Sequence, residues 1–98
     1  MKTILDIQDI AVIDAILLRN GIERQTLQLG EEMSELYVAI SHRLRGRTPN
    51  NDDIAEEVAD VLFMLSQMVR YFNLDLSQID DIINGKRNRM IERLQRGS

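Results

Sequence analysis

The sequence predicts an all-α protein, specifically an antiparallel four-helix bundle that forms oligomers. Apolar residues recur at steps of three and four through most of the 98 residues, as they do along helical faces. Pro49 is the only proline, and no segment shows the pattern of a strand. A chain of this length supports one modest hydrophobic core, so residues 1–98 are expected to form a single domain.

The first two predicted helices are separated by a glycine. One covers about Ile7–Arg19 and ends at Asn20-Gly21, a pair suited to the left-handed conformation that closes a helix. The next runs from about Glu23 to Arg45, with Gly46 as its stop and Pro49 beyond. Its core face follows steps of four, three, four and four residues: Leu29, Met33, Leu36, Ile40 and Leu44.

The third predicted helix spans about Asp53–Phe72, with Asn51 or Asp52 as its N-terminal cap. Its apolar residues cover far more than one face: Ile54, Val58, Val61, Leu62, Phe63, Met64, Leu65, Met68, Val69 and Phe72. One neighbouring helix cannot cover so wide a surface, so a second subunit is expected against it. The sequence therefore predicts a homodimer or a homotetramer, with a site that can include residues from two chains.

A fourth helix is predicted to open at Ser77, with Asp80 three residues later. Asn84-Gly85 is expected to bend or interrupt it. Its apolar residues again have helical spacing: Ile79, Ile82, Ile83, Met90, Ile91 and Leu94.

Charge is unevenly distributed along the chain. Residues 1–85 carry 7 basic and 15 acidic side chains, a net charge of −8, whereas residues 86–98 carry 5 basic and 1 acidic, a net charge of +4. An acidic body suits cation binding and does not suit nucleic acid, which requires a basic surface. We therefore expect no nucleic-acid partner.

Neither the cysteine content nor the N-terminal segment points to export or to a membrane. The chain has no cysteine, which excludes disulfides and thiolate metal sites. Asp6, Asp9 and Asp14 interrupt the apolar residues of the N-terminal segment, which argues against a signal peptide or a membrane span. A cytoplasmic location is the default expectation.

Two helices carry the same acidic arrangement, an acidic pair three residues apart that follows another glutamate. Glu32 and Glu35 form one pair, preceded by Glu31, and Glu57 and Asp60 form the other, preceded by Glu56. Residues three apart share a helical face, and each pair borders the predicted core. A short turn makes the two helices antiparallel neighbours, so four to six carboxylates are expected to converge.

Converging carboxylates repel one another unless a cation compensates them. Oxygen ligands without histidine or cysteine favour magnesium, with manganese as an alternative. A single acidic pair is more often a solvated helix face, and that interpretation stays open. A di-iron bundle is excluded because it needs a Glu-x-x-His step, and Ala39 stands three residues before the only histidine, His42.

The segments QTLQLGEEMSELYVAI and DDIAEEVADVLFMLSQMV resemble the MazG-like, all-α nucleoside triphosphate pyrophosphohydrolases. The family pattern is E-x-x-E, a spacer and E-x-x-D, which Glu32, Glu35, Glu57 and Asp60 match. Glu31 and Glu56 correspond to the commonly doubled glutamates, so they are possible further metal ligands. The resemblance extends over about residues 22–94.

The resemblance implies hydrolysis of a (deoxy)nucleoside triphosphate to the monophosphate and pyrophosphate, with magnesium between carboxylates and substrate. Water is the nucleophile, and a carboxylate accepts its proton, with Glu31 and Glu32 as candidates. A non-catalytic helical dimerisation or binding module with the same fold is the alternative.

Other candidate contacts to the nucleotide lie outside the acidic pairs. Members of the family use basic residues on the last helix against the phosphates, and Lys86, Arg89 and Arg93 are the candidates here. Cations that merely favour a helix C-terminus are the alternative interpretation. Gln25 and Gln28 lie on the Glu32 side of their helix, and Tyr71 on the Glu57 side, where they are weaker candidates for nucleotide binding.

Overall fold

The computed structural model describes residues 10–97, and these residues form four α-helices and no strand. The helices are α1 (Ile10–Asn20), α2 (Ile22–Leu44), α3 (Asn51–Tyr71) and α4 (Leu76–Gln95). The predicted all-α class is confirmed, while the predicted first helix start at Ile7 lies outside the described residues. Within residues 10–97, no helix is long and apolar enough to span a membrane.

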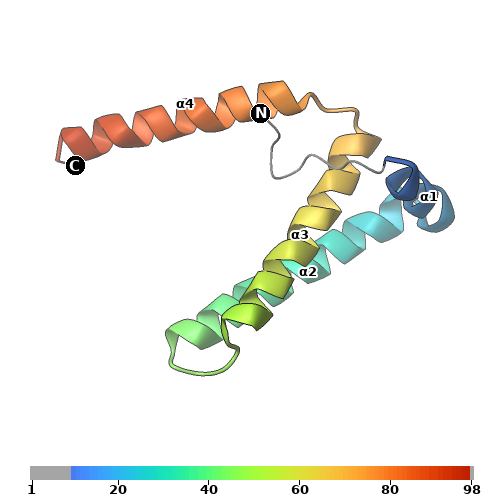
Figure 1. Ribbon diagram of the computed structural model, residues 1–98, viewed down its shortest axis with the longest axis horizontal. Coiled ribbons are helices and arrows are strands. Elements are labelled where there is room, and N and C mark those ends of the chain that lie inside the picture. Colours follow the sequence, from blue (N-terminus) through green and yellow to red (C-terminus); the bar gives the residue numbers. More distant parts are fainter. Residues whose placement is uncertain (1–9, 98) are drawn as a thin grey trace.

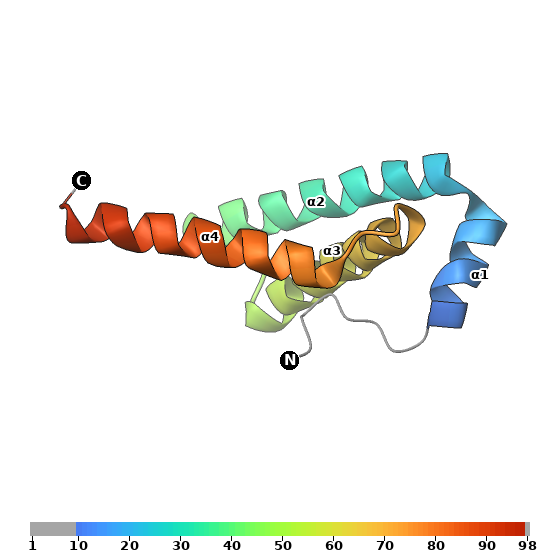
Figure 2. The same cartoon turned by 90° about the horizontal axis from the view of Figure 1, so that it is seen from above.

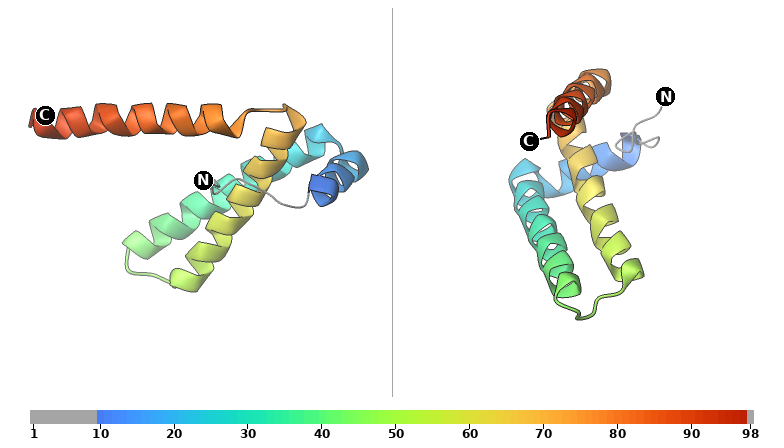
Figure 3. Two further views of the ribbon diagram at one scale, coloured as in Figure 1. Left: turned by 45° about the horizontal axis from the view of Figure 1, so that its top comes forward. Right: turned by 90° about the vertical axis from the view of Figure 1, so that its left-hand side faces the viewer.

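Helices α2 and α3 form an antiparallel hairpin, which is the most extensive helix contact in the described chain (Figure 3). Gly46 has a φ of 78° just beyond α2, as the sequence predicted for its stop. The cap of α3 is Asn50, however, rather than Asn51 or Asp52. The Asn50 side chain accepts a hydrogen bond from the Asp53 amide, and the Asp53 carboxylate accepts one from the Asn50 amide.

Helix α1 lies across one end of this hairpin and joins α2 through a sharp bend at Gly21 (Figure 2). Gly21 has a φ of 83° and a ψ of 154°, so the helix ends at a glycine with positive φ as predicted, but ψ lies outside the left-handed helical region. Ile13 is buried, and Asp14 accepts two hydrogen bonds from the Arg70 guanidinium, at 2.8 and 2.9 Å. This bidentate ion pair fixes α1 against the end of α3.

A buried amide network joins the same three helices. Gln25 donates from Nε2 to Gln67 Oε1 at 2.7 Å, and its Oε1 accepts from Asn20 at 3.0 Å. Gln25 and Gln67 are 5% and 1% exposed, so both amides are removed from water. Because buried amides must find partners within the protein, this network fixes the register of α2 against α3.

Helix α4 begins one residue earlier than predicted and is uninterrupted. Asp75, rather than Ser77, caps it and accepts from the Ser77 amide at 2.9 Å. The helix continues through Asn84 and Gly85, so the predicted bend is absent. It extends away from the other helices of the described chain and has no extensive contact with any of them (Figure 1). In the described part of one chain, α1, α2 and α3 therefore pack together and α4 projects from them. The predicted antiparallel four-helix bundle does not form within residues 10–97 of a single chain.

The hydrophobic core of the described chain is small. Its buried apolar side chains are Ile13, Val61 and Met64. The predicted core face of α2 is largely uncovered, since Met33, Ile40 and Leu44 are exposed. The radius of gyration is 16.4 Å, against about 13 Å for a compact chain of this length. One chain thus leaves much of its apolar surface in contact with solvent.

Replacing Gln67 with alanine should destabilise the protein measurably. Gln67→Ala leaves the buried Gln25 Nε2 without its acceptor, which should lower the free energy of unfolding by about 1–3 kcal/mol. Gln78→Ala, at an exposed glutamine of α4, is the matched control and should change it by less than about 0.5 kcal/mol. Urea unfolding at one fixed protein concentration measures both changes. Equal changes in the two variants would show that the network does not stabilise the hairpin.

Candidate metal centre

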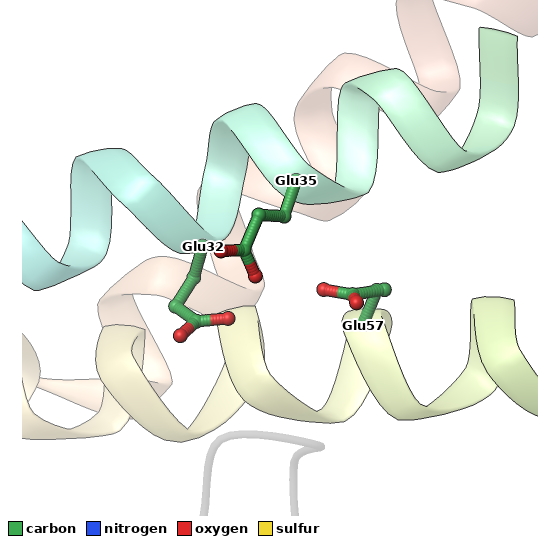
Figure 4. Close-up of side chains that lie close together, drawn as sticks. All are labelled: Glu32, Glu35 and Glu57. Atoms are coloured by element: carbon green, nitrogen blue, oxygen red, sulfur yellow. The ribbon is translucent and has the colours of Figure 1, made fainter.

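Three carboxylates from two helices meet in the α2–α3 hairpin. Glu32 and Glu35 extend from α2, and Glu57 extends from α3 into the same space (Figure 4). One oxygen from each lies within 4.8 Å of the others. The predicted convergence of the two acidic pairs is therefore present for these three residues.

Two of these carboxylates have buried oxygens that no hydrogen bond satisfies. Oε2 of Glu32 and Oε2 of Glu57 are both buried and have no partner within the described chain. The other Glu32 oxygen accepts a hydrogen bond from Gln28 Nε2 at 2.8 Å. Burial of a carboxylate oxygen without a hydrogen-bond partner lowers the stability of the folded state. A bound cation would compensate these two oxygens, so both are candidate metal ligands.

Burial and the neighbouring carboxylates raise the pKa of Glu57 above its ordinary value. Loss of hydration is the main cause, followed by repulsion from Glu35, Asp60, Glu32 and Glu56 in that order. A bound cation would reverse this repulsion and favour the ionised carboxylate.

The ligand set fits a hard divalent cation. Three carboxylates supply only oxygen atoms, and no described sulfur or histidine nitrogen joins the cluster. Magnesium takes a few carboxylates and fills its remaining positions with water and substrate phosphate. The residues therefore suit magnesium, and they suit manganese by the same chemistry.

The remaining predicted acidic residues lie around this cluster. Asp60 and Glu56 are exposed on α3 and affect Glu57 through their charges, but neither belongs to the group of converging oxygens. Glu31 is outside the group of converging oxygens, and it lines an open hollow of about 620 Å³ together with Gly30 and Glu35. Glu35 therefore belongs both to the carboxylate cluster and to the hollow that Glu31 lines.

A second hollow adjoins the cluster on the side of the hairpin turn. It has a volume of about 420 Å³, within the range of small-molecule sites, and it contains both Glu35 and Glu57. Val38, Ala39 and Pro49 supply apolar surface, and Ser34, His42 and Asp53 supply polar groups. A single histidine near the end of α2 does not by itself indicate such a hollow, because a cation there is also favoured by the helix dipole.

The predicted phosphate-binding residues share one face of α4. Lys86, Arg89 and Arg93 line a hollow of about 250 Å³ with Met90. Arg87 does not line this hollow and instead donates a hydrogen bond to Asn84 Oδ1 at 2.8 Å. Because α4 is uninterrupted, Arg87 lies on a different face of the helix from Lys86, Arg89 and Arg93. Because α4 projects from the hairpin, its own chain does not bring these cations to the carboxylates (Figure 1).

The three weaker nucleotide-binding candidates differ in position. Gln25 is buried and its amide is bonded within the fold, and Gln28 holds Glu32. Tyr71 is exposed beside Phe72 at an edge-to-face centroid distance of 5.0 Å. It follows Glu57 by 14 residues, or about 21 Å of helix, so it lies far from the cluster. The hydrogen bond from Gln28 to Glu32 was not predicted from the sequence. Gln28 stands four residues before Glu32, and this spacing could have indicated the contact.

Comparison with known proteins agrees with this geometry. The sequence model of the phosphoribosyl-ATP pyrophosphohydrolase family matches residues 11–87, which include the hairpin and its carboxylates. The chain belongs to this family. It is 32% identical over 72 residues to a phosphoribosyl-ATP pyrophosphatase of Methanosphaerula palustris, covering 72% of this chain and 67% of that protein. No solved structure matches significantly. The resemblance to MazG-like, all-α nucleotide pyrophosphohydrolases is thereby confirmed.

The raised pKa of Glu57 predicts a specific pH dependence in the metal-free protein. The folded state holds the Glu57 proton more tightly than the unfolded chain, in which the ordinary glutamate pKa is about 4.5. This contribution to stability is present at low pH and is lost as the pH rises through the raised pKa. In EDTA, Glu57→Gln should therefore exceed the wild type in stability by more at pH 7 than at pH 4.

Urea unfolding at the two pH values measures this difference, and Glu92→Gln on α4 serves as the control for loss of an exposed glutamate. An identical stability difference between Glu57→Gln and the wild type at pH 4 and pH 7 would contradict the prediction.

Proposed function

We propose that this protein hydrolyses phosphoribosyl-ATP to phosphoribosyl-AMP and pyrophosphate with magnesium as cofactor. The converging carboxylates of Glu32, Glu35 and Glu57 are the observation that carries this proposal. Membership of the phosphoribosyl-ATP pyrophosphohydrolase family supports the substrate. Phosphoribosyl-ATP is a substituted nucleoside triphosphate, so the proposal narrows the broader substrate class expected from the sequence.

Glu32, Glu35 and Glu57 would hold the metal, with Asp60 as a further ligand from the neighbouring turn of α3. The buried oxygens of Glu32 and Glu57 support this assignment because no protein group satisfies them. Gln28 orients Glu32 by donating to its other oxygen, as groups around metal ligands often do. Magnesium would neutralise charge on the phosphates and position them against the attacking water.

The reaction is hydrolysis of the bond between the α and β phosphates. The water oxygen forms a bond to the α phosphorus as the bond from this phosphorus to the bridging oxygen breaks, and pyrophosphate leaves. A carboxylate accepts the water proton, and Glu31 and Glu32 remain the two candidates. Glu31 is outside the converging group, so metal binding would leave it free to act as the base.

Substitution of the clustered glutamates should separate metal binding from proton transfer. Glu32→Gln and Glu57→Gln should lose the thermal stabilisation by millimolar magnesium and reduce kcat/KM by roughly 10–100-fold or more. If Glu31 is the base, Glu31→Gln should keep the magnesium stabilisation and lose kcat. Glu92→Gln on α4 should retain both properties.

The measurements are thermal unfolding with and without magnesium, and pyrophosphate release from phosphoribosyl-ATP. Wild-type protein that shows neither magnesium stabilisation nor pyrophosphate release would support the non-catalytic module. Release of orthophosphate would contradict the proposed bond cleavage.

We further propose that the active form is a homo-oligomer, with a dimer as the smallest assembly. Helix α4 presents Ile82, Ile83 and Leu94 to solvent, and α3 presents Phe63 and Phe72. Burial of these side chains against a second chain would remove apolar surface that the described part of one chain cannot cover. A partner could also bring Lys86, Arg89 and Arg93 to the carboxylates, where they would bind the substrate phosphates.

A mixing experiment tests whether two chains share one site. Glu57→Gln and Arg89→Ala should each be inactive alone. If the carboxylates and the cations come from different subunits, refolding an equal mixture should restore about a quarter of wild-type activity, because half of the dimers contain one intact site of two. No recovery above the separate variants, despite mixed dimers on native mass spectrometry, would place both groups in the same chain.

A further inference from the structure

Two adjoining hollows, which together we call the groove, lie between the carboxylate cluster and the hairpin turn. The hollow of about 420 Å³ that contains Glu35 and Glu57 shares Pro49 with another hollow of about 600 Å³ at the turn. The turn hollow is lined by Arg43, Gly46, Arg47, Thr48, Pro49, Asn50, Asn51 and Asp52. Pro49 thus connects an acidic end of the groove with an end that contains two arginines.

These arginines have no counter-ion within the described chain. Arg43, Arg45 and Arg47 alternate through the turn, and no carboxylate of residues 10–97 forms an ion pair with any of them. Arg43 lies in the last turn of α2, where the helix dipole favours a cation, but Arg47 lies beyond the helix. Arg43, Arg47 and Asp52 all line the hollow, so its charged lining residues are two arginines and one aspartate.

The groove follows one face of α2. Glu35, Ala39 and His42 follow one another at steps of four and three residues, so they lie in one row of α2, and Gly46 lies just beyond the end of this helix. Arg43 follows Glu35 by eight residues, which is about 12 Å of helix, and Arg47 lies further along. The middle of the groove offers the small apolar surface of Val38 and Ala39 together with the His42 ring.

We infer that Arg43 and Arg47 bind a second phosphate of the substrate, the one on the phosphoribosyl group, while the triphosphate lies at the carboxylate cluster. This inference rests on the proposed function. Phosphoribosyl-ATP carries phosphate at two separated positions, with two sugars and a base between them. The nucleoside lies over Val38 and Ala39, and guanidinium groups bind phosphate oxygens in a bidentate manner. The turn thereby selects a doubly phosphorylated nucleotide over ATP.

Steady-state kinetics on the full chain test this inference. KM is measured for phosphoribosyl-ATP, and the competitive inhibition constant is measured for ATP, which lacks the second phosphate. In Arg43→Ala and Arg47→Ala, KM for phosphoribosyl-ATP should rise at least about tenfold, in line with loss of a charge-assisted contact, while the constant for ATP changes less than twofold. Ribose 5-phosphate should inhibit the wild type and should no longer inhibit Arg47→Ala.

Arg45→Ala is the matched control, because it removes the same charge from the same turn but Arg45 does not line the hollow. It should leave both constants at their wild-type values. The inference is overturned if all three variants behave alike, or if the constants for phosphoribosyl-ATP and ATP rise by the same factor. Failure of the wild type to release pyrophosphate from phosphoribosyl-ATP would instead overturn the proposed function.

Discussion

The antiparallel pairing of α2 with α3 is the constraint on which the candidate site depends. It places Glu57 opposite Glu32 and Glu35, although mutual repulsion disfavours that arrangement in the absence of a cation. The Gln25–Gln67 hydrogen bond and the capped turn hold the two helices in register at opposite ends of the hairpin. The stability of the hairpin therefore supports a cluster of charges that is unfavourable by itself.

Charged groups are separated along the hairpin. Carboxylates occupy its middle, and Gln28 donates a hydrogen bond to one of them. Arginines without an ion pair in the described chain lie at its turn, and the groove between the two regions has apolar surface. The two helices thus carry both the proposed cation site and the proposed phosphate site. This separation suits a substrate that carries metal-bound phosphates at one end.

Much of the fold could be predicted from the sequence because local signals determine it. Glycines at positions 21 and 46 mark the helix ends through their positive φ values, and the periodic apolar residues indicate the helices. The caps were less predictable, because Asn50 and Asp75 compete with neighbouring residues that have similar side chains. The packing of α4 was predicted wrongly for a single chain, since apolar periodicity does not tell which chain will cover the helix.

The sequence by itself determined the helical class, the two acidic pairs and the chemistry that oxygen ligands prefer, since spacing along a helix fixes which side chains share a face. Only the tertiary structure decided that Glu32, Glu35 and Glu57 converge while Glu31 stays outside the converging group. It also decided that Gln25 is buried, and that the turn arginines share a groove with the carboxylates. These outcomes depend on the rotation of one helix against another, which local sequence patterns do not specify.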